Sequence, residues 1–261
     1  MWTDDGYRLT YGGYDYLALK TLSRRDSIYS VGNQIGVGKE SDIYLVADAQ
    51  GNQSVLKIHR LGRISFRSIK SNRDYLRNKH TSSWKYMARL AAMKEYAFLK
   101  VLHENGYPVP RPIDQNRHCI VMGLVDAYPL YQIQELEDPG ALYSKLMNLI
   151  VRLATAGLIH GDFNEFNLLV DDKSEPILID FPQMVSTRHR NAEMYFNRDV
   201  DCIRDFFRKR FQYVSKLYPK FTRDVDQTEA FRLDVQVAAS GFTLKDQSEL
   251  ERVSSWRFIH T

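Results

Sequence analysis

Cysteine is scarce in this sequence, and no long apolar run is present. The 261 residues include two cysteines, Cys119 and Cys202, which lie far apart and form no CxxC motif. A disulfide framework is therefore not expected, and both thiols fit the reducing cytosol or nucleus. The first twenty residues lack the features of a signal peptide. The longest apolar stretch, 149–159, contains Arg152 and is far shorter than the roughly 20 residues of a membrane span, so we expect a soluble protein.

Glycine and proline are also few, at 14 and 8 residues, which leaves little room for long linkers. Hydrophobic residues make up 44% of the chain, enough to bury the core of one large domain or of two lobes. The net charge is only +4, but it is unevenly distributed. Residues 57–89 hold ten Lys or Arg and one acid, Asp74, so this segment carries +9 and the remainder −5. A polyanionic partner is therefore a serious candidate.

The spacing of apolar residues predicts a sheet-based lobe followed by a helical lobe. Helices are expected over Tyr14–Leu22, after a glycine-rich turn, over Trp84–Leu102, over 138–156 and, as two more, after about Asn191. Residues 60–83 have no clean period and are expected to form a loop. Runs of β-branched and apolar residues predict strands at 31–36, 42–47, 54–59, 119–124, 170–172 and 177–180. A cleft between two such lobes would be the natural ligand site.

A glycine-rich turn, Gly36-Val37-Gly38-Lys39-Glu40-Ser41, separates the first two predicted strands of the sheet. Backbone amides at Gly36 and Gly38 can approach a phosphate without a Cβ atom in the way, and Lys39 can add positive charge. The turn is not a Walker loop, because no helix follows the lysine. Glycine turns between strands are also common, so the pattern alone leaves both interpretations open.

Lys57 lies inside a predicted strand with apolar neighbours on both sides. A buried lysine needs an anionic partner, whereas a lysine on an edge strand would face water. Glu95 lies among the apolar positions of the predicted long helix and could face that strand. A lysine and a glutamate that pair between strand and helix position the nucleotide phosphates in protein kinases.

The most specific motif is His160-Gly-Asp-Phe-Asn-Glu-Phe-Asn167, and the apolar-flanked Asp180 comes thirteen residues after it. Asp162 supplies a base. Asn167 and Asp180 supply oxygen ligands for Mg²⁺, which prefers hard donors and fills its other positions with water and phosphate. In a purely structural role, Asp162 would cap a turn and Asp180 would end a strand. The glycine turn, the lysine, the glutamate and this motif follow one another in the order found in kinases.

From Val31 to about Ser215 the sequence resembles the RIO family of atypical protein kinases. The segments GVGKESDIYLV, LKIHRLGR, HGDFNEFN and IDFPQMVS are similar to its RIO kinase 2 subfamily, and residues 5–22 resemble the end of that subfamily's winged-helix module. The resemblance implies an α+β, bilobal, protein-kinase-like fold of RIO type without an activation segment. It divides the chain into part of the winged-helix module (1–28), a kinase N-lobe (29–122), a C-lobe (123–232) and a C-terminal extension (233–261).

The resemblance also implies an enzyme, an atypical Ser/Thr protein kinase with ATPase activity that uses ATP and Mg²⁺. Asp162 would be its catalytic aspartate. Asp199, or its neighbour Asp201, would brace the backbone of the catalytic loop. Asp180 is in addition a candidate acceptor for a transient phosphoryl group, since carboxylates serve as acceptors in some ATPases.

The nucleotide contacts follow from the same resemblance. Lys57, paired with Glu95, would contact the α- and β-phosphates, and Asn167 and Asp180 would hold the metal. The other residues expected at ATP are Gly36, Gly38, Lys39, Ser41, a gatekeeper at Met122, and the backbone of Gly123 and Val125.

Several departures from ordinary protein kinases bear on mechanism. Gly161 replaces the arginine that pairs with a phosphorylated activation loop, and Asn164 replaces a lysine that stabilises the transferring phosphoryl group in many Ser/Thr kinases. Pro182 replaces the glycine of Asp-Phe-Gly and should stiffen the backbone. Only ten residues, 181–190, precede the next predicted helix. Because this leaves no platform for a peptide substrate, slow autophosphorylation or ATP hydrolysis is expected.

The partners implied by the resemblance are precursor particles of the small ribosomal subunit, with their rRNA, ribosomal proteins and other assembly factors. The expected location is the cytoplasm, with shuttling through the nucleus, and neither a membrane nor DNA is expected as partner. The basic segment fits an RNA partner, although a solvated insertion would have the same composition. The candidate RNA contacts are Arg60, Arg63, Arg67, Lys70, Arg73, Arg77 and Lys79.

Two alternatives stay open at this point. An aminoglycoside-type phosphotransferase also uses H-G-D-x-x-x-x-N, but it needs an acidic pocket for a cationic substrate, and the conspicuous insertion here is basic. A nucleotide-gated scaffold without turnover would not need the kinase residues, all of which are intact here. Mutating Asp162 distinguishes a switch from a scaffold.

Overall fold

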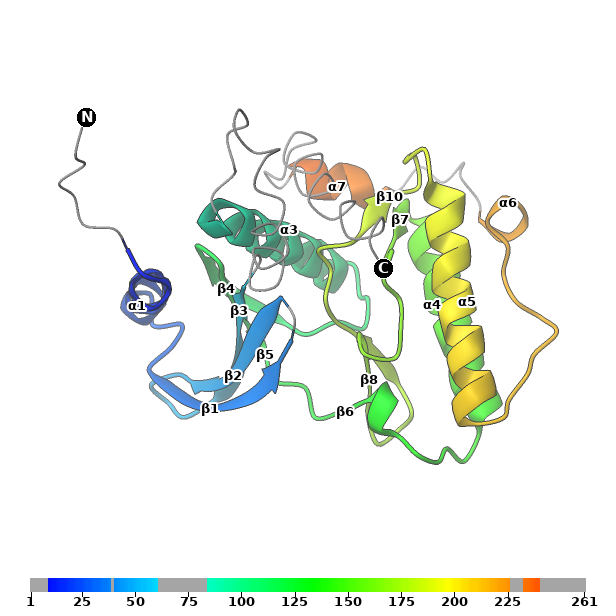
Figure 1. The fold of residues 1–261 in the computed structure, drawn as a ribbon, viewed down its shortest axis with the longest axis horizontal. Helices are drawn as coiled ribbons and strands as arrows, with labels where there is room; N and C mark the ends of the chain where they lie inside the picture. Colours follow the sequence, from blue (N-terminus) through cyan, green and yellow to red (C-terminus); the bar gives the residue numbers. More distant parts are fainter. Residues whose placement is uncertain (1–8, 39, 61–83, 226–231, 240–261) are drawn as a thin grey trace, which may run out of the picture. The chain divides into compact units, whose positions relative to one another are not determined.

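The structure, a computed structural model, describes residues 9–38, 40–60, 84–225 and 232–239 (Figure 1). The chain divides into two compact units, which are described separately. The first contains the described residues of Met1–Tyr96 and Pro112–Leu124, and the second those of Ala97–Arg111 and Val125–Glu249. The predicted boundary between the lobes, after residue 122, lies two residues before the end of the first unit. Residues 97–111 fall within the predicted first lobe but belong to the second unit.

The first unit contains a five-stranded antiparallel sheet with the strand order β1-β2-β3-β5-β4. Its strands are β1 (Ser30–Val37), β2 (Ser41–Ala47), β3 (Gln53–His59), β4 (Pro112–Asn116) and β5 (Cys119–Gly123). Four of these strands were predicted, within one or two residues at each end. β4 was not predicted, because its first residue is Pro112 and proline is uncommon in strands. Proline is tolerated there because β4 is an edge strand.

Helix α1 (Tyr11–Arg24) packs on this sheet. Its buried residues Ala18 and Leu22 belong to a core cluster with Val46, Leu56 and other residues of β2, β3 and β5. The helix starts earlier than the predicted residue 14, because the hydroxyl oxygen of Thr10 caps it by accepting a hydrogen bond from the backbone N–H of the second glycine in the first turn, Gly13 (3.1 Å). The prediction of a turn at that point is therefore wrong. The core cluster shows that α1 packs on the sheet of the first unit.

Helix α3 (Trp84–Glu104) begins in the first unit and ends in the second. The predicted amphipathic pattern is confirmed, since Ala88, Ala92, Leu99 and Leu102 are each fully buried. The helix is followed by Gly106, whose φ of +68° favours glycine.

Two long helices, α4 (Pro139–Thr155) and α5 (Ala192–Arg210), pack against each other in the second unit. Asp138 caps α4 by accepting a hydrogen bond from the backbone N–H of Ala141 (2.9 Å), and a proline occupies the first turn. Gly157, with a φ of +91°, ends the helix. These start and stop signals explain why α4 could be predicted from the sequence.

Short strands connect these helices and hold the loops described below. They are β6 (Tyr128–Pro129), β7 (Leu158–Ile159), β8 (Leu168–Val170), β9 (Pro176–Leu178) and β10 (Val185–Ser186). They form a three-stranded sheet in the order β6-β8-β9 and a separate β7/β10 pair. The remaining elements are the 3₁₀ turn η2 (Leu130–Gln132), α6 (Phe221–Asp224) and α7 (Leu233–Ala239).

Two predicted strands are shifted from their expected positions. Residues predicted as a strand at 170–172 enter a turn, because Asp171 Oδ1 accepts hydrogen bonds from the backbone N–H groups of Lys173 and Glu175 (2.9 and 2.8 Å). The strand predicted over 177–180 ends at Leu178, so Asp180 lies beyond it. The predicted loop at 61–83 lies outside the described residues. Across the described ranges, every helix is too short or too polar to cross a membrane.

Candidate active site

Lys57 lies in β3, the central strand of the first unit's sheet, opposite Ile43 of β2 and Ile120 of β5. Its Nζ lies 2.6 Å from Oε1 of Glu95 on α3, and the two side chains are only 8% and 1% exposed. Each charge compensates the other, because an isolated ion in such a place would carry a desolvation penalty of several kcal/mol. The structure thus brings together the lysine and the glutamate that the sequence predicted to pair.

His59 is a second basic group at the same glutamate, and the sequence analysis missed it. Its Nε2 lies 2.8 Å from Oε2 of Glu95, although this contact lacks the angles of a hydrogen bond. Alternate residues of a strand point to the same face, so a histidine two positions after Lys57 reaches the same carboxylate. The two-residue spacing of His59 from Lys57 in a predicted strand could have identified His59 from the sequence. Each oxygen of Glu95 therefore lies close to a nitrogen of a β3 side chain.

The glycine turn between β1 and β2 is tight. The backbone N–H of Gly38 donates to the backbone oxygen of Ser41 (2.7 Å), and a Cβ atom on Gly36 would come within 3.3 Å of the Ile43 side chain. Lys39 lies outside the described residues. The expected phosphate contacts at Gly36, Gly38 and Ser41 thus belong to a compact turn on the same sheet as Lys57.

The residues expected at the adenine lie at the end of β5. Met122 is buried (8% exposed) and is paired with Val55 of β3, and Gly123 is the last residue of the strand. Val125 follows the strand and belongs to the second unit. Their role in binding adenine stays a prediction.

The loop between β7 and β8 in the second unit carries Asp162. Its carboxylate accepts a hydrogen bond from Nδ2 of Asn164 (2.9 Å, to Oδ1) and one from Nδ2 of Asn167 (3.1 Å, to Oδ2). The Asn167 amide also donates to the backbone oxygen of Asp162 (2.9 Å). Burial and then the nearby Asp180 raise the pKa of Asp162 above that of an ordinary aspartate. Asp162 is therefore both fixed in place and more basic than a surface carboxylate.

Asp199 of α5 holds the backbone of this loop. Its carboxylate oxygens accept hydrogen bonds from the backbone N–H groups of Gly161 (2.8 Å) and Phe163 (3.1 Å), on either side of Asp162. Burial raises the pKa of Asp199 to about 7, in spite of these two donors. Asp201, the alternative in the sequence, pairs instead with Arg204 on the surface. The structure thus assigns the bracing role to Asp199.

Gly161 has a backbone conformation and a contact that other residues cannot adopt without strain. Its φ is +78°, and a Cβ atom would lie 2.8 Å from the backbone oxygen of Gln183. Replacing Gly161 by alanine should lower the free energy of unfolding by about 1–3 kcal/mol. Urea unfolding measures this loss. The control is Gly106→Ala, which has a similar φ but no atom within 4 Å of its Cβ. If the control lost as much stability as Gly161→Ala, the contact with Gln183 would have no role.

Asp180 follows β9 in a left-handed conformation, with a φ of +70°. The backbone N–H of its neighbour Ile179 donates to the backbone oxygen of Asn167 (3.0 Å), which ties the two expected metal ligands to each other through the main chain. A non-glycine residue with positive φ is unusual and marks strain that often accompanies function. This conformation was not expected, because a strand was predicted over residues 177–180.

The donor set of Asn167 and Asp180 fits Mg²⁺. The Asn167 amide nitrogen is fixed by Asp162, which sets the direction of the amide oxygen. One amide and one carboxylate are enough for Mg²⁺, whose other positions are filled by water and phosphate oxygens. In the described part of the chain, no group of three or more His, Cys, Asp or Glu side chains is arranged for a metal such as zinc.

The segment after Asp180 is short, as predicted. β10 and one turn lead directly into α5 at Ala192. The hydroxyl of Ser186 in β10 donates to Oδ2 of Asp234 (2.7 Å) at the start of α7, and Arg232 donates to the same oxygen (2.9 Å). This segment is thus held by Arg232 and α7.

One of the seven candidate RNA contacts, Arg60, lies in the described part of the chain. Arg60 is only 12% exposed and binds the carboxylates of Asp15 and Asp42, so its prediction as an RNA contact is corrected: its charge is already neutralised inside the first unit. The other six candidates lie outside the described residues. On α5, Arg204 and Arg208 pair with acids of the same helix, which agrees with an ordinary charged face.

Comparisons with known proteins cover nearly the whole chain. The model of the RIO domain matches residues 42–220, and that of the Rio2 N-terminal domain matches residues 3–25. Serine/threonine-protein kinase rio2 of Schizosaccharomyces pombe is 59% identical over 95% of this chain and 72% of its own length. The rio2 kinase of Dictyostelium discoideum is 60% identical over 96% of this chain, which spans only 47% of that relative.

Solved structures agree with the sequence matches. The Rio2 kinase of Chaetomium thermophilum, in an ADP/Mg²⁺-phosphoaspartate complex, aligns with a TM-score of 0.87 and 55% identity over 100% of this chain and 81% of that one. A second crystal structure of the same kinase aligns equally well. The predicted α+β kinase-like fold of RIO type is confirmed.

Proposed function

This chain belongs to the RIO family of atypical protein kinases, and from that premise we propose that it is a Rio2-type Ser/Thr kinase and ATPase that acts in late maturation of the small ribosomal subunit. The observation that carries the proposal is the fixed catalytic aspartate. Asp162 is held by Asn164 and Asn167, and its flanking backbone is held by Asp199. Such preorganisation of a reactive group is how kinases gain most of their rate.

The nucleotide is ATP, bound with Mg²⁺. Lys57, fixed by Glu95, contacts the α- and β-phosphates, and the glycine turn at Gly36 and Gly38 covers the phosphate chain. Asn167 and Asp180 hold the metal. When bound, Mg²⁺ neutralises the charge that develops on the phosphate oxygens during transfer. The ADP and Mg²⁺ in the Chaetomium Rio2 kinase support this assignment.

Asp180 accepts the γ-phosphoryl group. One of its carboxylate oxygens attacks the γ-phosphorus, the bond between that phosphorus and the β–γ bridging oxygen breaks, and ADP leaves with the electron pair. A water molecule then attacks the aspartyl phosphate and gives its proton to Asp162, and the bond from phosphorus to the Asp180 oxygen breaks to release phosphate. The raised pKa of Asp162 suits it to take that proton. The phosphoaspartate of the Chaetomium kinase supports such an intermediate.

The partner is a precursor of the small ribosomal subunit, and the protein acts in the cytoplasm with shuttling through the nucleus. The support lies in the charge of residues 61–89, which carry eight basic residues against one acid, without Lys57 and Arg60, whose charges are paired inside the first unit. A segment of this composition binds a phosphate backbone through release of counterions. Together with slow turnover of the nucleotide, it would let the phosphorylation state of the enzyme decide when the particle is released.

Sedimentation with purified precursor particles tests this role. The chain should co-sediment with the particles in the presence of Mg²⁺ and a non-hydrolysable ATP analogue, and should dissociate over time with Mg-ATP. Binding should weaken at least tenfold between 50 and 200 mM salt, since several phosphate contacts are made. Stable co-sedimentation whichever nucleotide is present would instead favour a scaffold without turnover. An absence of co-sedimentation under all conditions would contradict the ribosomal role.

A further inference from the structure

Asp15 of α1 is the centre of a polar cluster that the catalytic machinery does not use. Its carboxylate accepts two hydrogen bonds from the guanidinium of Arg60, with Nη1 at 2.6 Å and Nη2 at 2.8 Å. Nε2 of His118 lies 2.7 Å from Oδ1 of the same carboxylate. The His118 side chain is fully buried and stacks on Tyr14, with ring centroids 4.6 Å apart. A two-pronged arginine-carboxylate pair of this kind fixes direction as well as distance.

Arg60 also contacts β2, the second strand of the sheet. Its Nε donates to Oδ2 of Asp42 (3.0 Å), and its backbone N–H donates to the backbone oxygen of Glu40. Asp42 is buried, with 3% of its surface exposed. One arginine therefore joins helix α1 to two residues at the end of the glycine turn, through both its side chain and its main chain.

The geometry places this connection next to the expected phosphate contacts. Ser41 pairs with His59 in the β2/β3 ladder, and Asp42 pairs with Ile58. Arg60 leaves β3 one residue after His59, which contacts Glu95, and three residues after Lys57. The end of β3 is thus fixed on one side by Glu95 and on the other by Asp15 and Asp42. The exit of the glycine turn lies between these two anchors.

We propose that Asp15, through Arg60 and Asp42, positions the glycine turn for the phosphates of the nucleotide. α1 belongs to the part of the chain that matches the Rio2 N-terminal domain, whereas Asp42 is the first residue that matches the RIO domain. Asp15 is thus a positioning residue that lies outside the kinase domain and acts on ATP affinity. This inference rests on the proposed binding of ATP at the glycine turn and Lys57.

The ionisation of the cluster agrees with a permanent connection. The hydrogen bonds from His118 and Arg60 overcome the effect of burial and lower the pKa of Asp15 to about 2. The carboxylates of Asp15 and Asp42 overcome the effect of burial on Arg60 and raise its pKa. Burial lowers the pKa of His118. Asp15 and Arg60 therefore stay charged across the physiological range, and the connection is not a pH switch.

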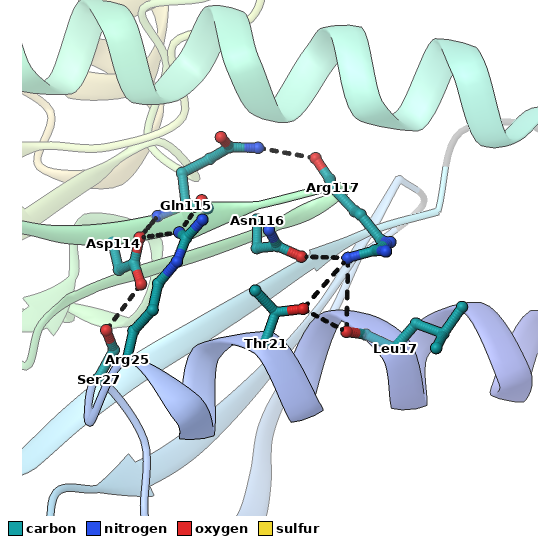
Figure 2. A network of polar contacts seen from close by, with 8 residues as sticks. All are labelled: Leu17, Thr21, Arg25, Ser27, Asp114, Gln115, Asn116 and Arg117. Carbon is teal, nitrogen blue, oxygen red and sulfur yellow. Dashed lines mark hydrogen bonds and ion pairs between the residues drawn. The ribbon is translucent and has the colours of Figure 1, made fainter.

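A second polar network on α1 supplies a matched control (Figure 2). Asp114 of β4 accepts hydrogen bonds from Nη1 of Arg25 (2.9 Å) and from the hydroxyl of Ser27 (2.7 Å), both near the end of α1. Nη1 of Arg117 reaches back to the hydroxyl of Thr21 (3.3 Å). This network fastens α1 to the β4/β5 hairpin. Its hydrogen bonds join the end of α1 to β4 and to the turn at Arg117, so breaking it loosens the helix through contacts other than those at the glycine turn.

The test compares Asp15→Asn with Asp114→Asn in the full chain. Each substitution keeps the shape of the side chain and removes one negative charge from the contacts between α1 and the sheet. Fluorescent ATP analogues with Mg²⁺ report the Kd, and steady-state ATP hydrolysis reports KM and kcat. Asp15→Asn should raise Kd and KM about five- to tenfold and change kcat less than twofold. Hydrogen exchange of residues 40–47 should become faster in Asp15→Asn alone. Asp114→Asn should leave Kd within twofold of the wild type, even where its thermal unfolding temperature falls as much.

A double variant shows whether the two residues act as one unit. Arg60→Met should weaken ATP binding as much as Asp15→Asn, and the pair together should be no worse than either alone, since coupled residues are non-additive. Equal effects of Asp15→Asn and Asp114→Asn would overturn the proposal, because they would show a general loss of stability. An unchanged Kd in Asp15→Asn would also overturn it while leaving the proposed function intact. A wild-type chain that did not bind Mg-ATP would instead refute the proposed function itself.

Discussion

Replacing Glu95 by alanine is expected to lower the free energy of unfolding by about 3–5 kcal/mol, because the buried ammonium of Lys57 would lose the carboxylate with which it pairs. Lys57 and Glu95 lie 2.6 Å apart with almost no exposure, and His59 would lose the same partner. The variant should also lose Mg-ATP binding, since the ammonium of Lys57 is no longer held in place. Urea unfolding and nucleotide titration measure the two effects.

Glu104 provides the matched control on the same helix. It pairs with Lys100 at 3.8 Å, and both side chains are 55% exposed, so Glu104→Ala should cost at most about 0.5 kcal/mol. The double variant Lys57→Met with Glu95→Leu separates the two roles of the pair. It should regain most of the stability, as buried pairs replaced by apolar residues often do, while ATP binding stays absent. A Glu95→Ala variant as stable as Glu104→Ala would contradict the buried pair.

Replacing Asp162 by alanine is expected to slow phosphate release in a single turnover by about 10²- to 10⁴-fold, the range for loss of a general base. The affinity for Mg-ATP should change little, because Lys57 and the glycine turn are untouched and the Asn167 amide keeps its hydrogen bond to the backbone oxygen of residue 162. Rapid-quench measurements with enzyme in excess of ATP give the rate. The raised pKa of Asp162 adds a pH signature. The rate should fall with acid at a higher pH than an ordinary aspartate would give, since the base is lost on protonation.

Asp201→Ala is the control for Asp162→Ala. Asp201 lies on the surface of α5, 64% exposed, and pairs with Arg204. Its loss should leave the single-turnover rate within twofold of the wild type. An Asp162→Ala variant that released phosphate as fast as this control would exclude Asp162 as the base.

Local sequence patterns were enough to predict most of the helices and strands and the ion pair between Lys57 and Glu95. An apolar strand around Lys57 and a glutamate within an apolar helix face left few alternatives to their pairing. The cap at Asp138 and the glycine after α4 fixed that helix within one or two residues. β4 escaped notice because proline usually ends elements, and its tolerance on an edge strand depends on strand order, which the sequence does not display.

Contacts between distant segments could not be predicted in this way. Asp15 meets Arg60 across 45 positions and His118 across 103, and none of the three stands out in its local sequence. Arg60 was therefore grouped by composition with the basic segment, although tertiary contacts place it between two carboxylates. The left-handed backbone of Asp180 was not predicted either, and it lies beside a contact between distant segments, the hydrogen bond from the backbone N–H of Ile179 to the backbone oxygen of Asn167.

Trapping the phosphorylated enzyme tests the account most directly. The wild type, Asp162→Ala and Asp180→Ala would be mixed with γ-labelled Mg-ATP, quenched, and treated with hydroxylamine, which cleaves acyl phosphates. We expect a hydroxylamine-labile label on the wild type, a larger and longer-lived one on Asp162→Ala, and none on Asp180→Ala that still binds ATP. A labile label of undiminished size on Asp180→Ala would contradict the assignment of this residue as the phosphoryl acceptor.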